Sequence, residues 1–207
     1  MFRTTLKKSA LAAVAVAATA AAIAPAAASA ATVNQAGGTL SVNALSGETN
    51  NMRVTLTDTY LEILENNSGG VQPQAGTTCI RFSPGHARCN LTGVSFIRVN
   101  AGDMHDYVVG DIYSSRRAFT MTGGTGNDYL DVMGSVDNRA FIHGDDGDDQ
   151  LYGRQFGDTI YGGNGNDWVT YGRTYDEQRH SPLDKINTTN AVSDNVFVRN
   201  INNRSSF

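Results

Sequence analysis

A nine-residue pattern recurs in the second half of this 207-residue chain. Residues 123–131 read GGTGNDYLD and residues 162–170 read GGNGNDWVT, so both copies have glycine at places 1, 2 and 4, aspartate at place 6 and an apolar residue at place 8. Glycine permits positive φ, which lets the main chain turn sharply and point its carbonyls at a shared centre. The residue at place 8 lies on a short strand and faces inward. The pattern therefore predicts a coil in which two consecutive copies make one full circuit.

The stacking of such circuits selects the ion that their turns can bind. Turns one circuit apart lie on the same edge, separated by the strand spacing of roughly 4.7–4.9 Å. An ion midway between two layers would lie about 2.4 Å from each, which matches the oxygen distance of about 2.3–2.6 Å that calcium prefers. Magnesium requires about 2.0–2.1 Å and strict octahedral geometry. The turns therefore predict calcium as the bound ion.

Three degenerate copies accompany the clean ones. Residues 144–152 (GDDGDDQLY) have aspartate at place 2 but keep the glycines at places 1 and 4. Residues 153–161 (GRQFGDTIY) lose the glycines at places 2 and 4, and residues 101–109 (AGDMHDYVV) have Met104 at place 4. We expect these last two turns to offer poorer ligand sets, because glycine is the residue that suits the turn conformation.

The spacing of the place-6 aspartates tests whether the turns stack. A full circuit is 18 residues, and the intervals between successive aspartates on one edge are 22, 21 and 18 residues. The first two circuits therefore carry insertions, which fit loops around 111–117 and 133–138. We expect about three inter-turn sites on this edge, the best between Asp149 and Asp167, and we expect Asp158 on the opposite edge. The aspartates that should share the first edge are Asp106, Asp128, Asp149 and Asp167.

This array resembles the RTX, or haemolysin-type, calcium-binding repeat family, and its layout resembles small secreted actinobacterial members. The resemblance covers residues 101–170, a third of the chain. It implies an all-β fold, a right-handed parallel β-roll or β-solenoid with calcium-binding turns and an N-terminal β cap. The ligand role of the family carries over to the matching turn residues: Asp106, Gly123, Gly124, Gly126, Asp128, Gly144, Asp146, Gly147, Asp149, Asp158, Gly162, Gly163, Gly165 and Asp167.

The N-terminal segment, residues 1–30, predicts a secretory signal peptide. Three basic residues precede an alanine-rich apolar stretch, and Ala28-Ser29-Ala30 supplies the small-residue site, so cleavage is expected after Ala30. A membrane anchor is the weaker alternative, because alanine is only weakly apolar. No later run is apolar enough to span a bilayer. We therefore expect a soluble extracellular protein.

Acidic residues are concentrated in the repeats. Residues 101–167 contain twelve aspartates, no glutamate and four arginines, a balance of −8, whereas loss of the signal peptide would take the whole chain from −4 to −7. Without calcium this segment should repel itself, so we expect calcium binding and folding to be coupled. For the aspartates outside the ligand set we expect surface charge or turn chemistry: Asp103, Asp111, Asp131, Asp137, Asp145 and Asp148.

Residues 31–100 predict a cap over the open end of the roll, with a separate binding domain as the alternative. Cys79 and Cys89 flank a Pro-Gly pair in a chain predicted to be secreted, which favours a disulfide over a metal or catalytic role. Residues 171–207 predict a degenerate C-terminal cap or tail with one more strand within 192–201. Strands of the cap are predicted from alternating β-branched segments at 39–42, 53–56, 60–64 and 96–99.

The sequence favours a non-enzymatic function. Its four histidines form no His-Glu-x-x-His pattern, and no Gly-x-Ser-x-Gly elbow is present. The leading interpretation is a secreted calcium-binding protein in which the ion drives folding. An extracellular carbohydrate-binding or polysaccharide-acting accessory protein is the alternative, with glycans bound by the place-7 aromatics Tyr107, Tyr129 and Trp168. A membrane-damaging toxin is disfavoured because no apolar insertion segment is present, and no nucleic-acid partner is expected.

Overall fold

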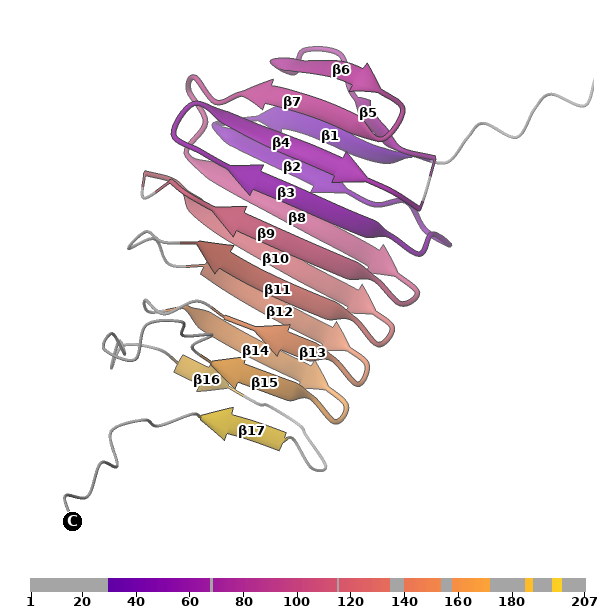
Figure 1. The fold of residues 1–207 in the computed structure, drawn as a ribbon, viewed down its shortest axis with the longest axis vertical. Coiled ribbons are helices and arrows are strands. Elements are labelled where there is room, and N and C mark those ends of the chain that lie inside the picture. The colour runs from indigo at the N-terminus through magenta and orange to yellow at the C-terminus, as the bar shows by residue number, and fades with distance from the viewer. Residues whose placement is uncertain are drawn as a thin grey trace, which may run out of the picture.

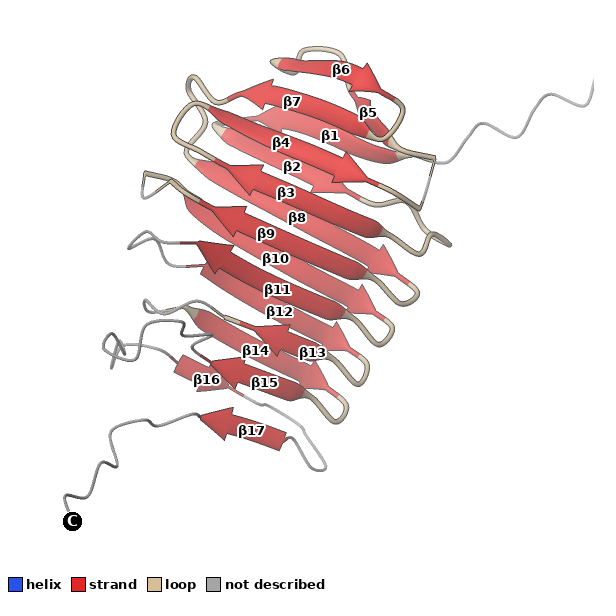
Figure 2. Ribbon diagram, viewed as in Figure 1, coloured by secondary structure: helices blue, strands red, loops and turns tan. Residues whose placement is uncertain are grey.

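The fold is a two-sheet parallel β-roll, seen in a computed structural model. The structure describes residues 30–67, 69–114, 116–134, 140–153 and 158–171, and the strands at 185–187 and 195–198. Within these residues every regular element is a β-strand (Figure 2), and none forms a helix of the length and apolarity needed to cross a bilayer. The all-β roll predicted from the repeats is thereby confirmed.

Two sheets run along the long axis of the molecule (Figure 1). The eight-stranded sheet contains, in spatial order, β5 (Val71–Pro73), β1 (Ala31–Ala36), β2 (Thr39–Asn43), β8 (Phe96–Asp103), β10 (Ala118–Thr125), β12 (Ala140–Asp146), β14 (Thr159–Asn164) and β16 (Lys185–Asn187). The nine-stranded sheet contains β6 (Cys79–Ser83), β7 (His86–Asn90), β4 (Tyr60–Glu65), β3 (Asn51–Leu56), β9 (Tyr107–Ile112), β11 (Tyr129–Gly134), β13 (Gln150–Tyr152), β15 (Trp168–Tyr171) and β17 (Asn195–Val198).

In the roll, the chain passes from one sheet to the other at every turn. Strands β8, β10, β12 and β14 pair in parallel in one sheet, and β9, β11, β13 and β15 do so in the other. The place-8 residues lie in register, because Leu130 pairs with both Val108 and Leu151. All three side chains are fully buried, as the inward position at place 8 requires. The repeat therefore builds the core as well as the turns.

The cap extends both sheets of the roll without a break. Strand β2 pairs in parallel with β8, and β3 pairs in parallel with β9. Beyond them the chain reverses, since the β1–β2, β3–β4 and β4–β7 pairs are antiparallel. The boundary that the sequence suggested at residue 100 falls inside β8, so the cap and the roll share a strand.

The predicted disulfide is present between Cys79 and Cys89. It joins β6 to β7 as a cross-strand pair at the outer end of the cap. The segments predicted as cap strands correspond to β2, β3, β4 and β8, whereas β1, β5, β6 and β7 were not predicted. These four strands contain shorter apolar alternation, and their pairing partners decide their structure.

Two short strands continue the roll toward the C-terminus. Strand β16 pairs in parallel with β14, and β17 pairs in parallel with β15. Strand β17 lies inside the segment 192–201 that was predicted to add a strand. Residues 1–29 of the predicted signal peptide, the loop residues 135–139 and most of the predicted tail lie outside the described residues.

Candidate metal centre

The place-6 aspartates form a ladder along one edge of the roll, which we call the aspartate edge (the right-hand side of Figure 1). The backbone N–H of Asp106 donates to Oδ1 of Asp128 at 2.9 Å. The same bond joins Asp128 to Asp149 at 2.8 Å and Asp149 to Asp167 at 3.0 Å. All four residues are at most 4% exposed. Each coil therefore orients the carboxylate of the coil that follows it.

The second oxygen of three of these carboxylates has no hydrogen bond of this kind. Oδ2 is buried without a hydrogen-bond partner in Asp106, Asp128 and Asp149. A buried charged oxygen that lacks a partner is costly, and native proteins almost always satisfy such groups. The ladder thus leaves a column of inward-facing oxygens that requires a cation or a proton.

Glycine at place 1 leaves space beside these oxygens. A Cβ at Gly123 would stand 2.3 Å from Asp128 Oδ2 and 2.7 Å from the carbonyl oxygen of Gly144. A Cβ at Gly144 would stand 2.2 Å from Asp149 Oδ2 and 2.4 Å from the carbonyl oxygen of Gly162. A side chain at place 1 would therefore fill a cradle of oxygens from two successive turns. We call these the Gly123 cradle and the Gly144 cradle.

Places 2 and 4 favour glycine for a different reason, because both have positive φ. A Cβ at Gly126 would stand 1.4 Å from the carbonyl oxygen of Met104, so the layers approach too closely for any side chain there. The degenerate copies keep this geometry with other residues, since Met104 has φ 79° and Asp145 has φ 71°. Aspartate tolerates this conformation better than methionine does. Both degenerate turns therefore retain the shape of the clean ones.

A second ladder joins the residues at place 5. The N–H of Asn127 donates to Nδ1 of His105 at 2.7 Å, the N–H of Asp148 to Oδ1 of Asn127 at 3.0 Å, and the N–H of Asn166 to Oδ1 of Asp148 at 2.8 Å. Asp148 thus performs the turn chemistry expected of it. These bonds fix the spacing of the turns without using the buried oxygens.

The buried carboxyls of the ladder attract protons strongly. Burial, together with the charges of Asp128 and Asp167, raises the pKa of Asp149 to about 7. Burial also raises the pKa of Asp106 to about 6 and moves the pKa of Asp128 upward. A cation between the layers would reverse this effect, because an opposite charge favours the ionised carboxylate. The site is therefore electrostatically prepared for a positive ion.

The available donors are oxygens only. Among the described residues, no three His, Cys, Asp or Glu side chains gather at one point, so main-chain carbonyls must supply most of the ligands. Carbonyl and carboxylate oxygens suit calcium, whereas zinc favours nitrogen and sulfur. The cradles and the unpartnered oxygens thus fit calcium.

Comparison with protein families gives the same result. A model of the RTX calcium-binding nonapeptide repeat matches residues 120–137 and 142–177 in four copies. The chain carries RTX calcium-binding repeats. RTX repeats bind Ca²⁺, so the predicted ion is confirmed; they are typically non-catalytic, and proteins that contain them are usually extracellular. The RTX match begins after residues 101–109, although the structure shows the same turn there.

Comparisons with whole proteins give only short matches. A segment of 29 residues is 66% identical to the dehydrogenase subunit of the quinone alcohol dehydrogenase of Gluconobacter oxydans (strain 621H), covering 14% of this chain and 4% of that protein. A segment of 23 residues is 74% identical to the corresponding subunit of Komagataeibacter europaeus, covering 11% of this chain and 3% of that protein. No solved structure matches the chain. Such short segments indicate nothing about activity.

Two predicted ligands lie apart from the cradles. Asp158 is buried on the opposite edge, where its Oδ1 accepts the N–H of Ala140 at 2.8 Å. The space beside its place-1 glycine is bordered by the Ile160 side chain at 2.8 Å and not by a carbonyl. Asp146 is exposed, and its carboxylate accepts the amide of Asn164 at 2.6 Å. Neither carboxylate faces an oxygen cradle.

The expectation of surface charge was wrong for Asp111 and Asp131. They are 5% and 3% exposed. The Nε of Arg53 lies 2.6 Å from Asp111 Oδ2, and the hydroxyl of Tyr129 donates to Asp131 at 3.3 Å. Both aspartates lie on strands and not in turns, because β9 extends beyond its repeat through Asp111 and β11 includes Asp131 at place 9. Partners on neighbouring positions compensate the buried charge.

The tyrosine rings of the predicted aromatic ladder contact one another. The Tyr107 and Tyr129 rings lie 4.6 Å apart and nearly parallel, and the Tyr129 and Tyr152 rings lie 4.9 Å apart. Both neighbours therefore cover Tyr129, and Tyr152 was not part of the prediction. Trp168 is 43% exposed, and its Nε1 donates to Thr170 at 2.8 Å.

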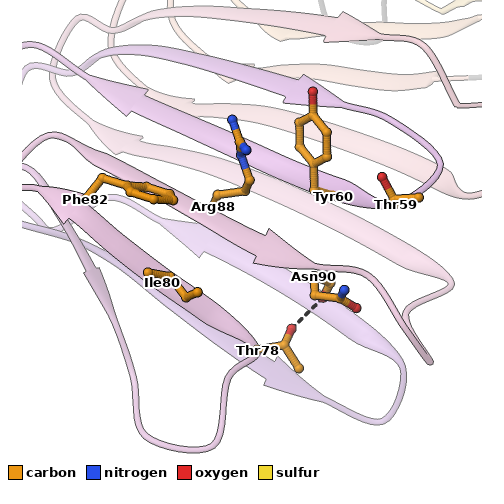
Figure 3. Close-up of a pocket in the computed structure, with 7 residues that line it drawn as sticks. All are labelled: Thr59, Tyr60, Thr78, Ile80, Phe82, Arg88 and Asn90. Atoms are coloured by element: carbon orange, nitrogen blue, oxygen red, sulfur yellow. Dashed lines mark hydrogen bonds between the residues drawn. The ribbon is translucent and has the colours of Figure 1, made fainter.

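An open groove of about 260 Å³ lies on the outer face of the cap (Figure 3). The guanidinium of Arg88 lies 4.6 Å from the centre of the Tyr60 ring and pairs with Glu62 at 2.7 Å. Ile80 and Phe82 are exposed beside it on β6. The sequence pattern gave no sign of this groove. Its lining residues are Thr59, Tyr60, Thr78, Ile80, Phe82, Arg88 and Asn90.

Proposed function

We propose that this is a secreted, non-enzymatic calcium-binding protein in which calcium bridges stacked turns and drives the roll to fold. The observation that carries the proposal is a pair of oxygens from two successive turns that border the space beside a place-1 glycine, one of them a buried carboxylate oxygen without a hydrogen-bond partner. In the Gly123 cradle these are Asp128 Oδ2 and the carbonyl oxygen of Gly144. Two such oxygens repel each other unless a cation lies between them.

The structure supports two complete cradles on the aspartate edge. The Gly123 cradle would hold calcium through Asp128 and the Gly144 carbonyl, and the Gly144 cradle through Asp149 and the Gly162 carbonyl. A third would use Asp167, whose Oδ2 lies 2.2 Å from a Cβ placed at Gly162. The turn of Asp106 suits calcium less, because Ala101 at place 1 carries the methyl group that glycine lacks.

Coupling between calcium and folding follows from the charges. Bound calcium supplies the positive charge that the buried carboxylates require. Without it, Asp128, Asp149 and Asp167 must either take up protons or repel one another across the coils. Short strands such as β13, with Leu151 as its single fully buried side chain, provide little apolar burial to offset this repulsion.

Secretion is supported by four observations. The first 30 residues have the composition of a signal peptide, and β1 begins at Ala31, directly after the expected cleavage site. The Cys79–Cys89 disulfide suits an oxidising compartment. RTX proteins are usually extracellular, which agrees with both.

Calorimetric titration of residues 31–207 with calcium, paired with circular dichroism, tests the function. We expect saturable binding and a gain of strand signal. Asp149→Asn should remove or strongly weaken one site, because it keeps the ladder acceptor but removes the charge. The matched control is Asp146→Asn in the same turn, which should bind as the unsubstituted protein does. Absence of binding at millimolar calcium would overturn the proposal, and equal effects of both variants would overturn the cradle assignment.

Carbohydrate binding is a second candidate, favoured by Trp168 alone. Its indole is exposed and held in place by Thr170, and a fixed exposed indole can stack on a sugar ring. The predicted platform of Tyr107 and Tyr129 is less suited, because those rings cover each other. Retention on insoluble polysaccharides that is lost in Trp168→Ala, with calcium affinity unchanged, would support this function. Unaltered retention, or none in the unsubstituted protein, would reject it.

A further inference from the structure

The groove in the cap, which we call the cap groove, lies on the outer face of the nine-stranded sheet (Figure 3). Strand β7 pairs with β4 on one side and with β6 on the other, and β6 is the last strand of that sheet. Side chains alternate along a strand, so Tyr60 and Arg88 face outward while Leu61 and Ala87 are fully buried. The cap groove shares no lining residue with the calcium cradles.

One end of the cap groove presents neutral hydrogen-bonding groups. Tyr60 pairs with Asn90 across β4 and β7, and the N–H of Asn90 donates to the carbonyl oxygen of Thr78 at 3.1 Å, so the three residues form one row across the sheet. The Oδ1 of Asn90 accepts the N–H of Thr92 at 2.8 Å, which orients the side-chain amide. Within the described part of the chain, the Nδ2 of Asn90 and the hydroxyls of Thr59 and Tyr60 form no hydrogen bond. These groups are therefore available to a ligand.

The positive charge in the middle of the cap groove is already paired. The guanidinium of Arg88 lies 4.6 Å from the centre of the Tyr60 ring and 5.7 Å from that of the Phe82 ring (Figure 3). Its Nη2 donates to Glu62 at 2.7 Å, and the Nε2 of His86 lies 2.9 Å from the same oxygen. These hydrogen bonds lower the pKa of the Glu62 carboxyl, so it stays ionised beside Arg88. An anionic ligand would have to compete with Glu62, and the cap groove therefore favours a neutral one.

The wall of the cap groove on β6 is apolar. Ile80 is 65% exposed and Phe82 is 56% exposed. The pairing of β6 with β7 is irregular between Arg81 and Ser83, so Phe82 lies at a bulge, a feature that re-aims a side chain. The Phe82 ring lies 4.9 Å from the ring of His86, a contact that holds it in place. Exposed apolar side chains that gather beside a groove mark a binding surface more than single ones do.

The ligand that matches this groove is neutral, and it is apolar on one side and polar on another. A sugar ring has this character, because its faces carry C–H groups and its rim carries hydroxyls. A purely apolar ligand would leave the donors of Asn90 and Tyr60 without partners. The groove volume of about 260 Å³ is just below the roughly 300–1,000 Å³ of sites for drug-sized ligands, so it suits one sugar unit of a longer chain.

We propose that the cap groove binds a sugar unit of a neutral glycan. Phe82 and Ile80 contact a face of the sugar ring, and the amide of Asn90 and the hydroxyl of Tyr60 bond to its hydroxyls. The inference goes beyond calcium binding and does not rest on it, because the cap groove lies outside the residues that match the RTX repeat. It is also a different site from Trp168 on β15, since β13, β11, β9 and β3 lie between β15 and β4 in the sheet.

Calorimetric titration of residues 31–207 in calcium with cellohexaose, xylohexaose, laminarihexaose and chitohexaose tests the inference. Trp168 is the single tryptophan of the chain, so its fluorescence, recorded in parallel, reports binding at the other candidate site. We expect saturable binding of at least one of the four probes without a change in tryptophan emission. Absence of binding to all four would overturn the inference. Binding that always changes the emission and disappears in Trp168→Ala would also overturn it, in favour of the Trp168 site.

Two variants with matched controls locate the site. Phe82→Ala removes the apolar wall and should weaken binding of the probe about tenfold. Its control is Phe96→Ala, which removes a ring that is 54% exposed on the eight-stranded sheet. Tyr60→Phe removes one hydroxyl and keeps the ring beside Arg88, so it should weaken binding about three- to tenfold. Its control is Tyr113→Phe, which changes a tyrosine that is 52% exposed.

Both controls should bind the probe as the unsubstituted protein does, and equal effects of Phe82→Ala and Phe96→Ala would overturn the assignment. The calcium stoichiometry of Phe82→Ala should not change, so a failure of sugar binding is distinguishable from a failure of the proposed function. Sedimentation velocity tests whether a second copy of the chain covers the groove instead. Self-association of the unsubstituted protein that is lost in Phe82→Ala would overturn the inference, and a monomer at all concentrations would support it.

Discussion

Strands of the cap and strands of the distal coils belong to the same two continuous sheets, but the cap buries mainly apolar side chains and the distal coils also bury carboxylates. In the cap, β3 alone buries Met52, Val54 and Leu56. In the distal coils, β13 buries Leu151 while the adjoining turn buries Asp149. Each fully buried large apolar side chain contributes about 1.5–3 kcal/mol, whereas each buried carboxylate is unfavourable until it is neutralised. A continuous sheet can therefore contain one part that folds alone and one that depends on ions.

Removing calcium should separate the two regions most strongly. Each site occupied at about a hundred times its dissociation constant adds about 2.7 kcal/mol, so two cradles make a large difference. We expect EGTA to lower the melting temperature of residues 31–207 and to abolish part of the strand signal, with the cap strands unaffected. Circular dichroism melts measure this. Identical melts with and without calcium would remove the distinction between the regions.

Filling one cradle should produce the next largest effect. In Gly144→Ala, the new methyl would stand 2.2 Å from Asp149 Oδ2 and 2.4 Å from the Gly162 carbonyl oxygen. We expect the loss of one calcium site and destabilisation by about 3 kcal/mol or more in calcium. Thr125→Ala, at an exposed position of the preceding turn, is the control. Unchanged calcium stoichiometry in Gly144→Ala would refute the position of the cradle.

Reducing the disulfide should affect the opposite end of the molecule. The Cys79–Cys89 bond closes a loop with a sequence separation of 10 residues, for which a stabilisation of roughly 2–3 kcal/mol is expected. The double variant Cys79→Ser/Cys89→Ser should therefore melt earlier, in calcium and in EGTA alike. Its calcium stoichiometry, measured by titration, should not change. A calcium site lost with the disulfide would show that the two regions are not separable.

The effect of pH on the melting temperature should be smaller than the effects above. Its direction should differ between EGTA and calcium. Burial raises the pKa of Asp149 to about 7 and that of Asp106 to about 6, both well above the ordinary range of an aspartate. Because these carboxyl pKa values are raised in the folded state, they stabilise the calcium-free protein at low pH. This contribution is lost as pH rises through about 6 to 7. In EGTA the melting temperature should thus be higher at pH 5 than at pH 8.

Calcium should stabilise the protein more at pH 8, because protons compete for the same oxygens. Thermal melts in EGTA and in calcium at both pH values give the comparison. Asp149→Asn removes one titrating group and should flatten the profile in EGTA. An increment from calcium that is equal at pH 5 and pH 8 would show that these carboxyls are not the groups that bind it.

The roll could be predicted from the sequence because each of its features recurs. Glycines at fixed places, aspartate at place 6 and an apolar residue at place 8 each repeat, so the register and the aspartate edge follow from counting. The predicted alignment of Asp106, Asp128, Asp149 and Asp167 corresponds to the hydrogen-bonded ladder. Because the pattern repeats, the neighbours of each coil can be inferred from the sequence without the three-dimensional structure.

The remaining features depend on single partners that no periodicity signals. Asp111 is buried because Arg53, 58 residues earlier, reaches it across the β3–β9 pair. The N–H of Asn50 donates to Asp106 Oδ1 at 2.7 Å, and Asn50 belongs to the ladder only through the register of that same pair, since its own turn lacks the nonapeptide pattern. Strands β6 and β7 likewise depend on each other and on the disulfide. Such contacts are specified by three-dimensional pairing, so sequence spacing could not find them.

The aspartate ladder has a polarity. In every rung the donor is an amide of the earlier coil and the acceptor is a carboxylate of the later one, from Asn50 to Asp167. A carboxylate is therefore aimed only when the coil before it already exists, and nothing in these bonds lets a later coil guide an earlier one. The coils can therefore add to the cap one after another, starting with the coil next to it. A chain synthesised from its N-terminus supplies the coils in this same order.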